Sequence, residues 1–150
     1  MVLNPKNGYK AYFLLLITSC VIIILQGEII MSVKIYHCKE CGRTLLTIKE
    51  GTKDEFPMKE LKAFAVEGAR EKHIPVFEVK DGIVDVNVGS IDHPMSEEHY
   101  IEYVVLETNQ GNSVKMLKPG EKPHVKFALV EGEEVVHVYA YCNLHGLWMA

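Results

Sequence analysis

The chain has 150 residues and a formal net charge of −4, and 48% of its residues are hydrophobic. This composition can form a buried core, which excludes global disorder, and its weak acidity gives no electrostatic reason to bind nucleic acid. The four cysteines, Cys20, Cys38, Cys41 and Cys142, are too few and too unevenly spaced for a secreted disulfide framework. We therefore expect a cytoplasmic protein with reduced, metal-binding thiols.

Residues 1–30 form an apolar N-terminal extension. Residues 12–25 are almost wholly apolar and follow two lysines, which is typical of a membrane anchor or a signal peptide. The run is shorter than the roughly 20 residues of a spanning helix, and no small-residue cleavage motif follows it. A third interpretation is that translation starts at Met31, because residues 26–30 can be encoded by a purine-rich stretch like a bacterial ribosome-binding site. These alternatives stay open, and only the first two make the protein membrane-anchored or exported.

Residues 31–65 are predicted to form a small β-rich unit. Within this unit, apolar residues lie on both sides of the turn-like segment Cys38-Lys-Glu-Cys41-Gly42. Residues 51–57 are polar and end in proline, which indicates a linker. The apolar positions within residues 58–72 predict one or two short helices.

From Pro75 onward the pattern indicates strands. Val76–Val79 leads into Asp81-Gly82, a strong hairpin signal, and residues 83–88 alternate apolar and polar side chains, so that one face of the strand is buried. Further strands are predicted at residues 100–107, 113–117, 124–130 and 134–141, with turn residues between them. Several short strands at this spacing favour an antiparallel β-sandwich.

Three local groups carry side chains that bind metals. The first contains His73, the second His93 and His99, and the third Cys142 and His145. A lone histidine is more often a structural residue, whereas a Cys-x-x-His pair is a common half of a metal site because one short loop lets both side chains reach one ion.

Taken together and in order, these groups resemble the superoxide reductase and desulfoferrodoxin family over about residues 66–150. The matching motifs are EKHIP at 71–75, GSIDHPMSEEHYIE at 89–102, LKPG at 117–120 and YCNLHGLW at 141–148. The resemblance implies an all-β fold: an immunoglobulin-like seven-stranded β-sandwich for residues 66–150, preceded by a desulforedoxin-like unit at residues 31–65.

The resemblance also implies an enzyme, an oxidoreductase that reduces superoxide by one electron to hydrogen peroxide and forms no dioxygen. Its cofactor is one mononuclear non-haem iron, with four imidazoles in a plane and one axial thiolate, which leaves one position open for a small anion. By motif position these ligands are His73, His93, His99, His145 and Cys142.

Two further residues and the partners follow from the same resemblance. Lys72 is expected to be a cation that attracts superoxide to the open face, and Glu71 to be the carboxylate that caps the oxidised iron. The electrons are expected from a rubredoxin-like donor, and the chain is expected to form a homodimer.

The N-terminal unit departs from the family pattern. Cys38 and Cys41 match the first cysteine pair of a four-thiolate iron site, but no second pair follows them. We therefore expect a remnant without iron, with a Cys38–Cys41 disulfide or a site shared between two chains as the alternatives.

Two rival functions use other combinations of the same features. A structural zinc site would combine Cys38, Cys41, Cys142 and His145. A binding module of immunoglobulin-like fold without catalysis is the second rival, because a fold does not fix a function.

Overall fold

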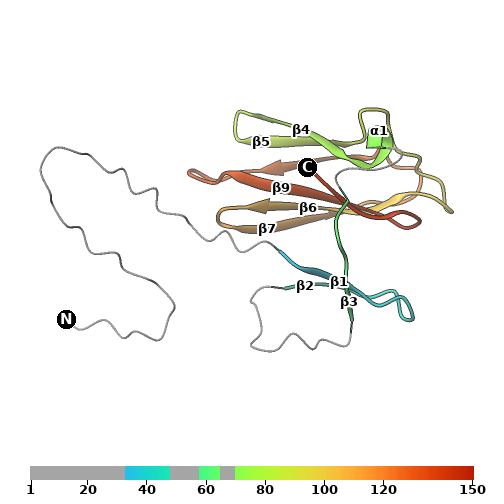
Figure 1. Cartoon of the computed structure of the whole chain (residues 1–150). Coiled ribbons are helices and arrows are strands. Elements are labelled where there is room, and N and C mark those ends of the chain that lie inside the picture. Colours follow the sequence, from blue (N-terminus) through green and yellow to red (C-terminus); the bar gives the residue numbers. More distant parts are fainter. Residues whose placement is uncertain (1–32, 48–57, 65–69) are drawn as a thin grey trace, which may run out of the picture.

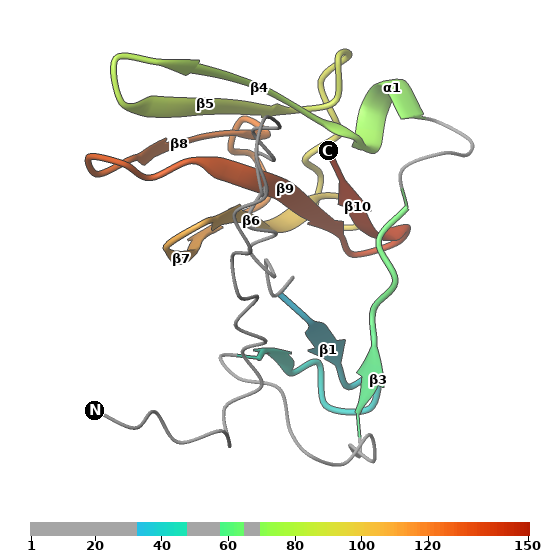
Figure 2. The ribbon, with the colours of Figure 1, turned by 60° about the vertical axis from the view of Figure 1, so that its left-hand side comes forward.

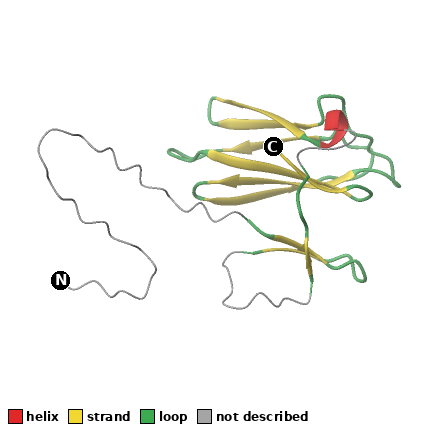
Figure 3. Cartoon of the chain, in the orientation of Figure 1, coloured by secondary structure: helices red, strands yellow, loops and turns green. Residues whose placement is uncertain are grey.

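The computed structural model describes residues 33–47, 58–64 and 70–150 (Figure 1). The predictions for residues 1–30 and for a start at Met31 lie outside these described residues, as does the domain boundary expected near residue 65. Among the described residues, no helix has the length and apolar character that crossing a membrane requires. Strands and turns make up nearly all of the described chain, and α1 (Arg70–His73) is a single short helix within it (Figure 3). The predicted all-β fold class is thus confirmed.

A small antiparallel sheet precedes the main domain. It contains β1 (Ile35–His37), β2 (Thr44–Leu46) and β3 (Lys59–Glu60), with β1 in the centre. Between β3 and Phe64 the chain is extended rather than helical, so this part of the helix prediction for residues 58–72 was wrong. The extended form prevails because the Leu61 N–H donates to the Ile35 carbonyl, at 2.7 Å, and because Leu61 and Ala63 pack into an apolar cluster beneath the main domain.

Seven strands form the main domain as two facing antiparallel sheets (Figure 1 and Figure 2). One sheet has the order β10-β9-β6-β7 and the other the order β4-β5-β8. The strands are β4 (Pro75–Lys80), β5 (Ile83–Val88), β6 (Ile101–Thr108), β7 (Gly111–Met116), β8 (His124–Ala128), β9 (Val135–Cys142) and β10 (Gly146–Met149). This arrangement agrees with the sandwich that the resemblance implied.

The core between the two sheets follows from the alternation of side chains along the strands. Val84, Val86 and Val88 of β5 are fully buried, whereas the residues between them are partly exposed. They pack against inward-facing residues of the other sheet, among them Ile101 and Cys142. Cys142 therefore belongs to the core, and it lies at the end of β9, directly before the turn to β10.

Much of β6 and β9 is buried on both faces of their sheet, because the N-terminal unit covers the outer face there. Tyr103, Tyr139 and Tyr141 point away from the sandwich core and pack with Val33 and Ile35. The Tyr103 and Tyr141 rings stack at 5.0 Å with an interplanar angle of 5°. The N-terminal unit and the sandwich thus share a second apolar core.

A buried carboxylate links the N-terminal unit to this sheet. Glu107 of β6 is 2% exposed, and its oxygens accept hydrogen bonds from the Val33 N–H and from the Tyr139 hydroxyl, both at 2.8 Å. The His137 Nδ1 lies 3.1 Å from the same carboxylate. A buried charge is tolerated when it is hydrogen-bonded in this way.

Candidate metal centre

Five side chains from four parts of the chain meet at one end of the sandwich. His73 ends α1, His93 and His99 lie in the loop from β5 to β6, and Cys142 ends β9, while His145 lies in the turn to β10. One ligand atom from each of them lies within 4.8 Å of all the others. The structure therefore brings together all five residues that the motifs singled out.

The four imidazoles surround a common centre. Ring centroids are 4.8 Å apart for His73 and His93, 4.5 Å for His93 and His99, 4.8 Å for His99 and His145, and 4.7 Å for His145 and His73. The His73–His99 separation of 6.2 Å is longer than each of these four, as expected for a diagonal. Neighbouring rings are inclined by 71° to 81°, so each presents its edge to the next. This is a four-cornered arrangement of imidazoles.

Hydrogen bonds indicate which nitrogens face the centre. The Nδ1 of His93 lies 2.6 Å from the Pro94 carbonyl, which makes Nδ1 the protonated nitrogen and leaves the Nε2 lone pair for another partner. His145 instead turns Nδ1 inward, 2.9 Å from the His73 Nε2 and 3.5 Å from the Cys142 Sγ. Three imidazoles thus offer Nε2, counting that of His99, and one offers Nδ1.

The donor set fits a transition-metal ion such as iron. The buried Nε2 atoms of His93 and His99 have no hydrogen-bond partner within the described part of the chain, although buried nitrogens are normally paired. Coordination would satisfy both lone pairs. Neutral imidazoles together with a thiolate are ligands that suit iron, and the fifth donor is the fully buried Cys142.

Burial favours the neutral, metal-binding form of two of the four imidazoles. It lowers the pKa of His93 to about 4, and it also lowers the pKa of His99, with smaller effects from His145, His73 and Lys72. Burial raises the pKa of the Cys142 thiol, so a metal ion must displace the thiol proton on binding. In the metal-free site, His93 and His99 therefore favour the neutral form, and Cys142 becomes a thiolate when the ion binds.

Asn143 fastens the β9–β10 turn to the loop that carries His93 and His99. Its Oδ1 accepts a hydrogen bond from the Tyr100 N–H at 3.0 Å, and its Nδ2 donates to the Glu98 carbonyl, also at 3.0 Å. The sequence motif YCNLHGLW contains Asn143 but gave it no role. Its position directly after Cys142, in a motif that recurs in the family, was the available signal.

Gly89 allows the β5–β6 loop to pass close beside α1. Its φ is +87°, and its neighbour Ile91 donates its N–H to the Glu71 carbonyl at 2.9 Å. A Cβ at position 89 would lie 2.3 Å from the Ile91 carbonyl oxygen and 2.8 Å from both the Glu71 oxygen and the Lys72 Cα. Only glycine fits here, and this approach places His73 next to His93. Gly89 was also quoted in a motif without a role.

Trp148 supports the cluster from β10. Its ring stacks on the His73 ring at 4.6 Å with an interplanar angle of 20°, and the centroid of the Phe64 ring lies 5.5 Å from that of Trp148. The chain at Phe64 is held to β10 by hydrogen bonds to Leu147 and from Met149, of 2.9 and 3.1 Å. Trp148 thus packs around the site.

Lys72 and Glu71 lie on α1 directly before His73, and both are exposed. Lys72 is near enough to contribute to the lowered pKa of His99, which places its positive charge beside the cluster. The remaining histidines lie elsewhere: His37 contacts Thr44, His124 pairs with Asp85, and His137 contacts Glu107.

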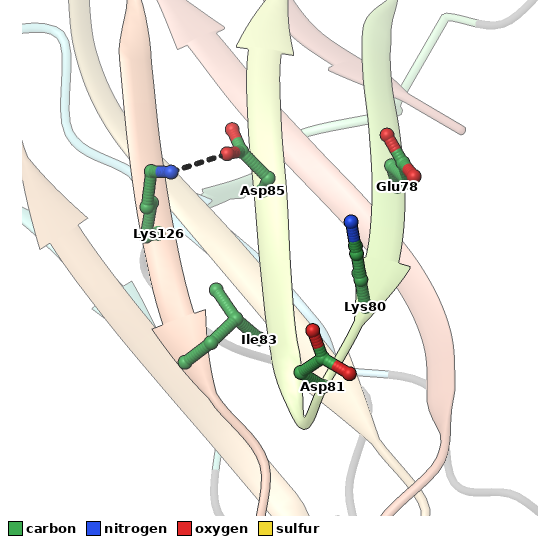
Figure 4. Close-up of a pocket in the computed structure, with 6 residues that line it drawn as sticks. All are labelled: Glu78, Lys80, Asp81, Ile83, Asp85 and Lys126. Atoms are coloured by element: carbon green, nitrogen blue, oxygen red, sulfur yellow. Dashed lines mark ion pairs between the residues drawn. The ribbon is translucent and has the colours of Figure 1, made fainter.

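Two other arrangements match the structure less well. The grouped ligands do not include Cys38 and Cys41, which the zinc alternative requires beside Cys142 and His145. A surface depression on the sheet of β4, β5 and β8 lies near the β4–β5 turn (Figure 4). This turn is at the opposite end of the hairpin from α1 (Figure 1). Charged residues of both signs line this depression, and Lys126 and Asp85 form an ion pair of 2.6 Å there. None of its lining residues belongs to the group of metal-ligand side chains found in the described part of the chain.

The chain is similar to known proteins in both sequence and fold. The family model described as desulfoferrodoxin matches residues 65–150. The desulfoferrodoxin of Nitratidesulfovibrio vulgaris is 40% identical over 121 residues, covering 78% of this chain and 94% of the relative. The desulfoferrodoxin homolog of Archaeoglobus fulgidus is 36% identical over 121 residues, covering 78% and 95%. The crystal structure of the superoxide reductase from Treponema pallidum matches with a TM-score of 0.69 and 35% identity, covering 79% of this chain and 97% of that one.

Proposed function

The chain belongs to the desulfoferrodoxin family, and we propose that it reduces superoxide to hydrogen peroxide at one iron held by His73, His93, His99, His145 and Cys142. It is thus an oxidoreductase, and its reaction adds one electron and two protons to superoxide without forming dioxygen. The observation that carries the proposal is the five-donor cluster, whose ligand atoms lie within 4.8 Å of one another. When bound, iron would supply the one-electron couple.

Residues of the chain would bind the iron, attract the substrate and cover the oxidised site. The four imidazoles hold their lone pairs toward one point, and the buried Cys142 adds an anionic sulfur from the sandwich core. Lys72, exposed beside the cluster, attracts the anionic substrate. Glu71 is proposed as the carboxylate that closes over the site in the oxidised protein.

We propose a small redox protein of the rubredoxin type as electron donor. The cluster lies close to the surface, because His145 is exposed and Leu144 beside it in the turn is 61% exposed. An apolar side chain at the rim of a redox site suits a short-lived protein contact. Exchange of Leu144 for aspartate should slow reduction by rubredoxin and leave reduction by dithionite unchanged.

We also propose a homodimer and an N-terminal unit without iron. β4 is an edge strand of its sheet, and its apolar residues Val76, Phe77 and Val79 are 50%, 38% and 49% exposed, which is the kind of surface that a second copy covers. Light scattering would measure the mass in solution. The Cys38–Cys41 pair supplies only half of a four-thiolate site, so one iron per chain is expected and two would contradict this proposal.

The deciding experiment combines iron content, absorption and product analysis. Iron-loaded protein should contain one iron per chain and, once oxidised, show a visible thiolate-to-iron band, which a zinc protein lacks. A pulse of superoxide should then yield hydrogen peroxide without dioxygen. A colourless protein after iron loading, or dioxygen in step with peroxide, would rule out the proposed function.

A further inference from the structure

We propose that Cys38 and Cys41 form a reversible dithiol–disulfide pair that hydrogen peroxide oxidises. The pair lies outside the metal centre and is used by no step of the proposed function. In the family pattern its position belongs to a four-thiolate iron site, which this chain cannot complete from one cysteine pair.

The turn between β1 and β2 presents both thiols together. The Cys38 N–H donates to the Arg43 carbonyl at 2.9 Å, and the Gly42 N–H donates to the Cys38 carbonyl at 2.8 Å, so the backbone closes around the two cysteines. Gly42 has a φ of +70°, which this tight turn requires. The ends of the turn are therefore fixed while its side chains stay accessible: Cys41 is exposed and Cys38 is partly buried.

Contacts within the turn favour the reactive form of Cys38. A hydrogen bond with the Cys41 side chain, and others with the backbone of Cys41 and Glu40, lower the pKa of Cys38. A thiolate in a Cys-x-x-Cys turn is a nucleophile with a second thiol in reach. Within the described residues, no group of three or more ligand side chains includes either cysteine. The local chemistry is therefore that of a redox pair rather than of a complete metal site.

The oxidant comes from the proposed function, and in that respect this inference rests on it. The β1–β2 turn and the β9–β10 turn lie at the same end of the molecule (Figure 1), and the His37 ring is 5.5 Å from the Tyr141 ring, the residue before Cys142. Peroxide that leaves the metal centre reaches the accessible pair by diffusion through solvent.

The oxidation balances without a further reactant. The Cys38 thiolate attacks one peroxide oxygen and breaks the O–O bond, which gives a sulfenic acid and, after protonation, one water. The Cys41 sulfur then attacks the Cys38 sulfur, the S–S bond forms, and the second water leaves. Two thiols lose two electrons and two protons, and one peroxide is reduced to two waters. A dithiol reductant reverses the change by thiol–disulfide exchange.

The test uses the full iron-loaded chain with Cys20 replaced by serine, and compares it with Cys38→Ser and Cys41→Ser in that background. After reagent hydrogen peroxide, the parent should lose two alkylatable thiols and two hydrogen atoms of mass per chain, and dithiothreitol should restore both. Neither serine variant should show the paired loss. Thiols that stay free, a gain of oxygen that dithiothreitol does not reverse, or a disulfide between two chains would each overturn the proposal.

Two further measurements distinguish this inference from a metal site at the cysteine pair and from the proposed function. Zinc added before alkylation should not protect the thiols, and protection without loss of mass would mean a metal site and overturn the redox assignment. Superoxide given in place of peroxide should produce the same disulfide. If hydrogen peroxide forms the disulfide but superoxide does not, the pair is established as a redox couple. The proposed enzymatic function is then the part that is refuted.

Discussion

Replacement of Gly89 by alanine tests how the metal centre is positioned. The new Cβ would lie 2.3 to 2.8 Å from three backbone atoms, two of them in α1, and backbone at this distance must move. We expect a destabilisation of about 2–5 kcal/mol, from a left-handed φ without glycine together with overpacking. Because α1 ends at His73, we also expect most of the bound iron to be lost.

Gly82→Ala is the matched control for this prediction. Gly82 has a similar φ of +73°, but a Cβ there would meet its nearest atom, the Leu129 carbonyl oxygen, at an ordinary 3.7 Å. It should cost only about 1–2 kcal/mol, the conformational part, and leave iron binding intact. Urea unfolding with and without chelator gives the stabilities, and iron analysis gives the occupancy. Equal stability and equal iron content in the two variants would refute the reasoning.

Three further predictions concern charged residues. Lys72→Ala should slow the second-order reaction with superoxide about 3-fold and weaken its salt dependence, as measured by pulse radiolysis, whereas Lys80→Ala on β4 should change neither. Glu107→Gln should lower the free energy of unfolding in urea by about 1.5–3 kcal/mol, because buried hydrogen bonds to a charged acceptor are weakened; an unchanged midpoint would contradict this. Lys126 lowers the pKa of Asp85, so the carboxylate stabilises the fold above its unfolded pKa and less as the pH falls through its folded pKa. Asp85→Asn should therefore be less stable than the parent at neutral pH and equally stable in acid, and a gap that is independent of pH would exclude this linkage.

The sandwich was largely predictable from local patterns. The alternation in residues 83–88 and the Asp81-Gly82 turn specify β5 and its hairpin, because a period of two and a left-handed turn leave few other structures. β10 was missed in the strand pattern, since its four residues contain the short segment Leu147-Trp148 with no alternation to mark it. Its strand form depends on pairing with β9, which is a tertiary effect.

The site was predictable as a set of residues but not as a geometry. Ordered motifs identified the five donors, whereas no sequence pattern tells that His145 turns Nδ1 inward while His93 turns Nε2 inward. That choice depends on the Pro94 carbonyl and on the short reach from the β9–β10 turn. The extended chain at Leu61 escaped prediction for a related reason, because its partners lie on β1 and beneath the sheet, far away in the sequence.

Tyr141 and Cys142 are neighbours on β9 that face opposite sides of their sheet, one toward the N-terminal unit and one toward the metal ligands. Deletion or insertion of a single residue in β9 would exchange the two sides, putting a phenol among the imidazoles and a thiol under the accessory sheet. Insertions or deletions in this strand therefore preserve the contact with the N-terminal unit and the metal ligand only when they comprise an even number of residues. Natural variation in β9 should consist of substitutions, and the loops at its ends should absorb the changes in length.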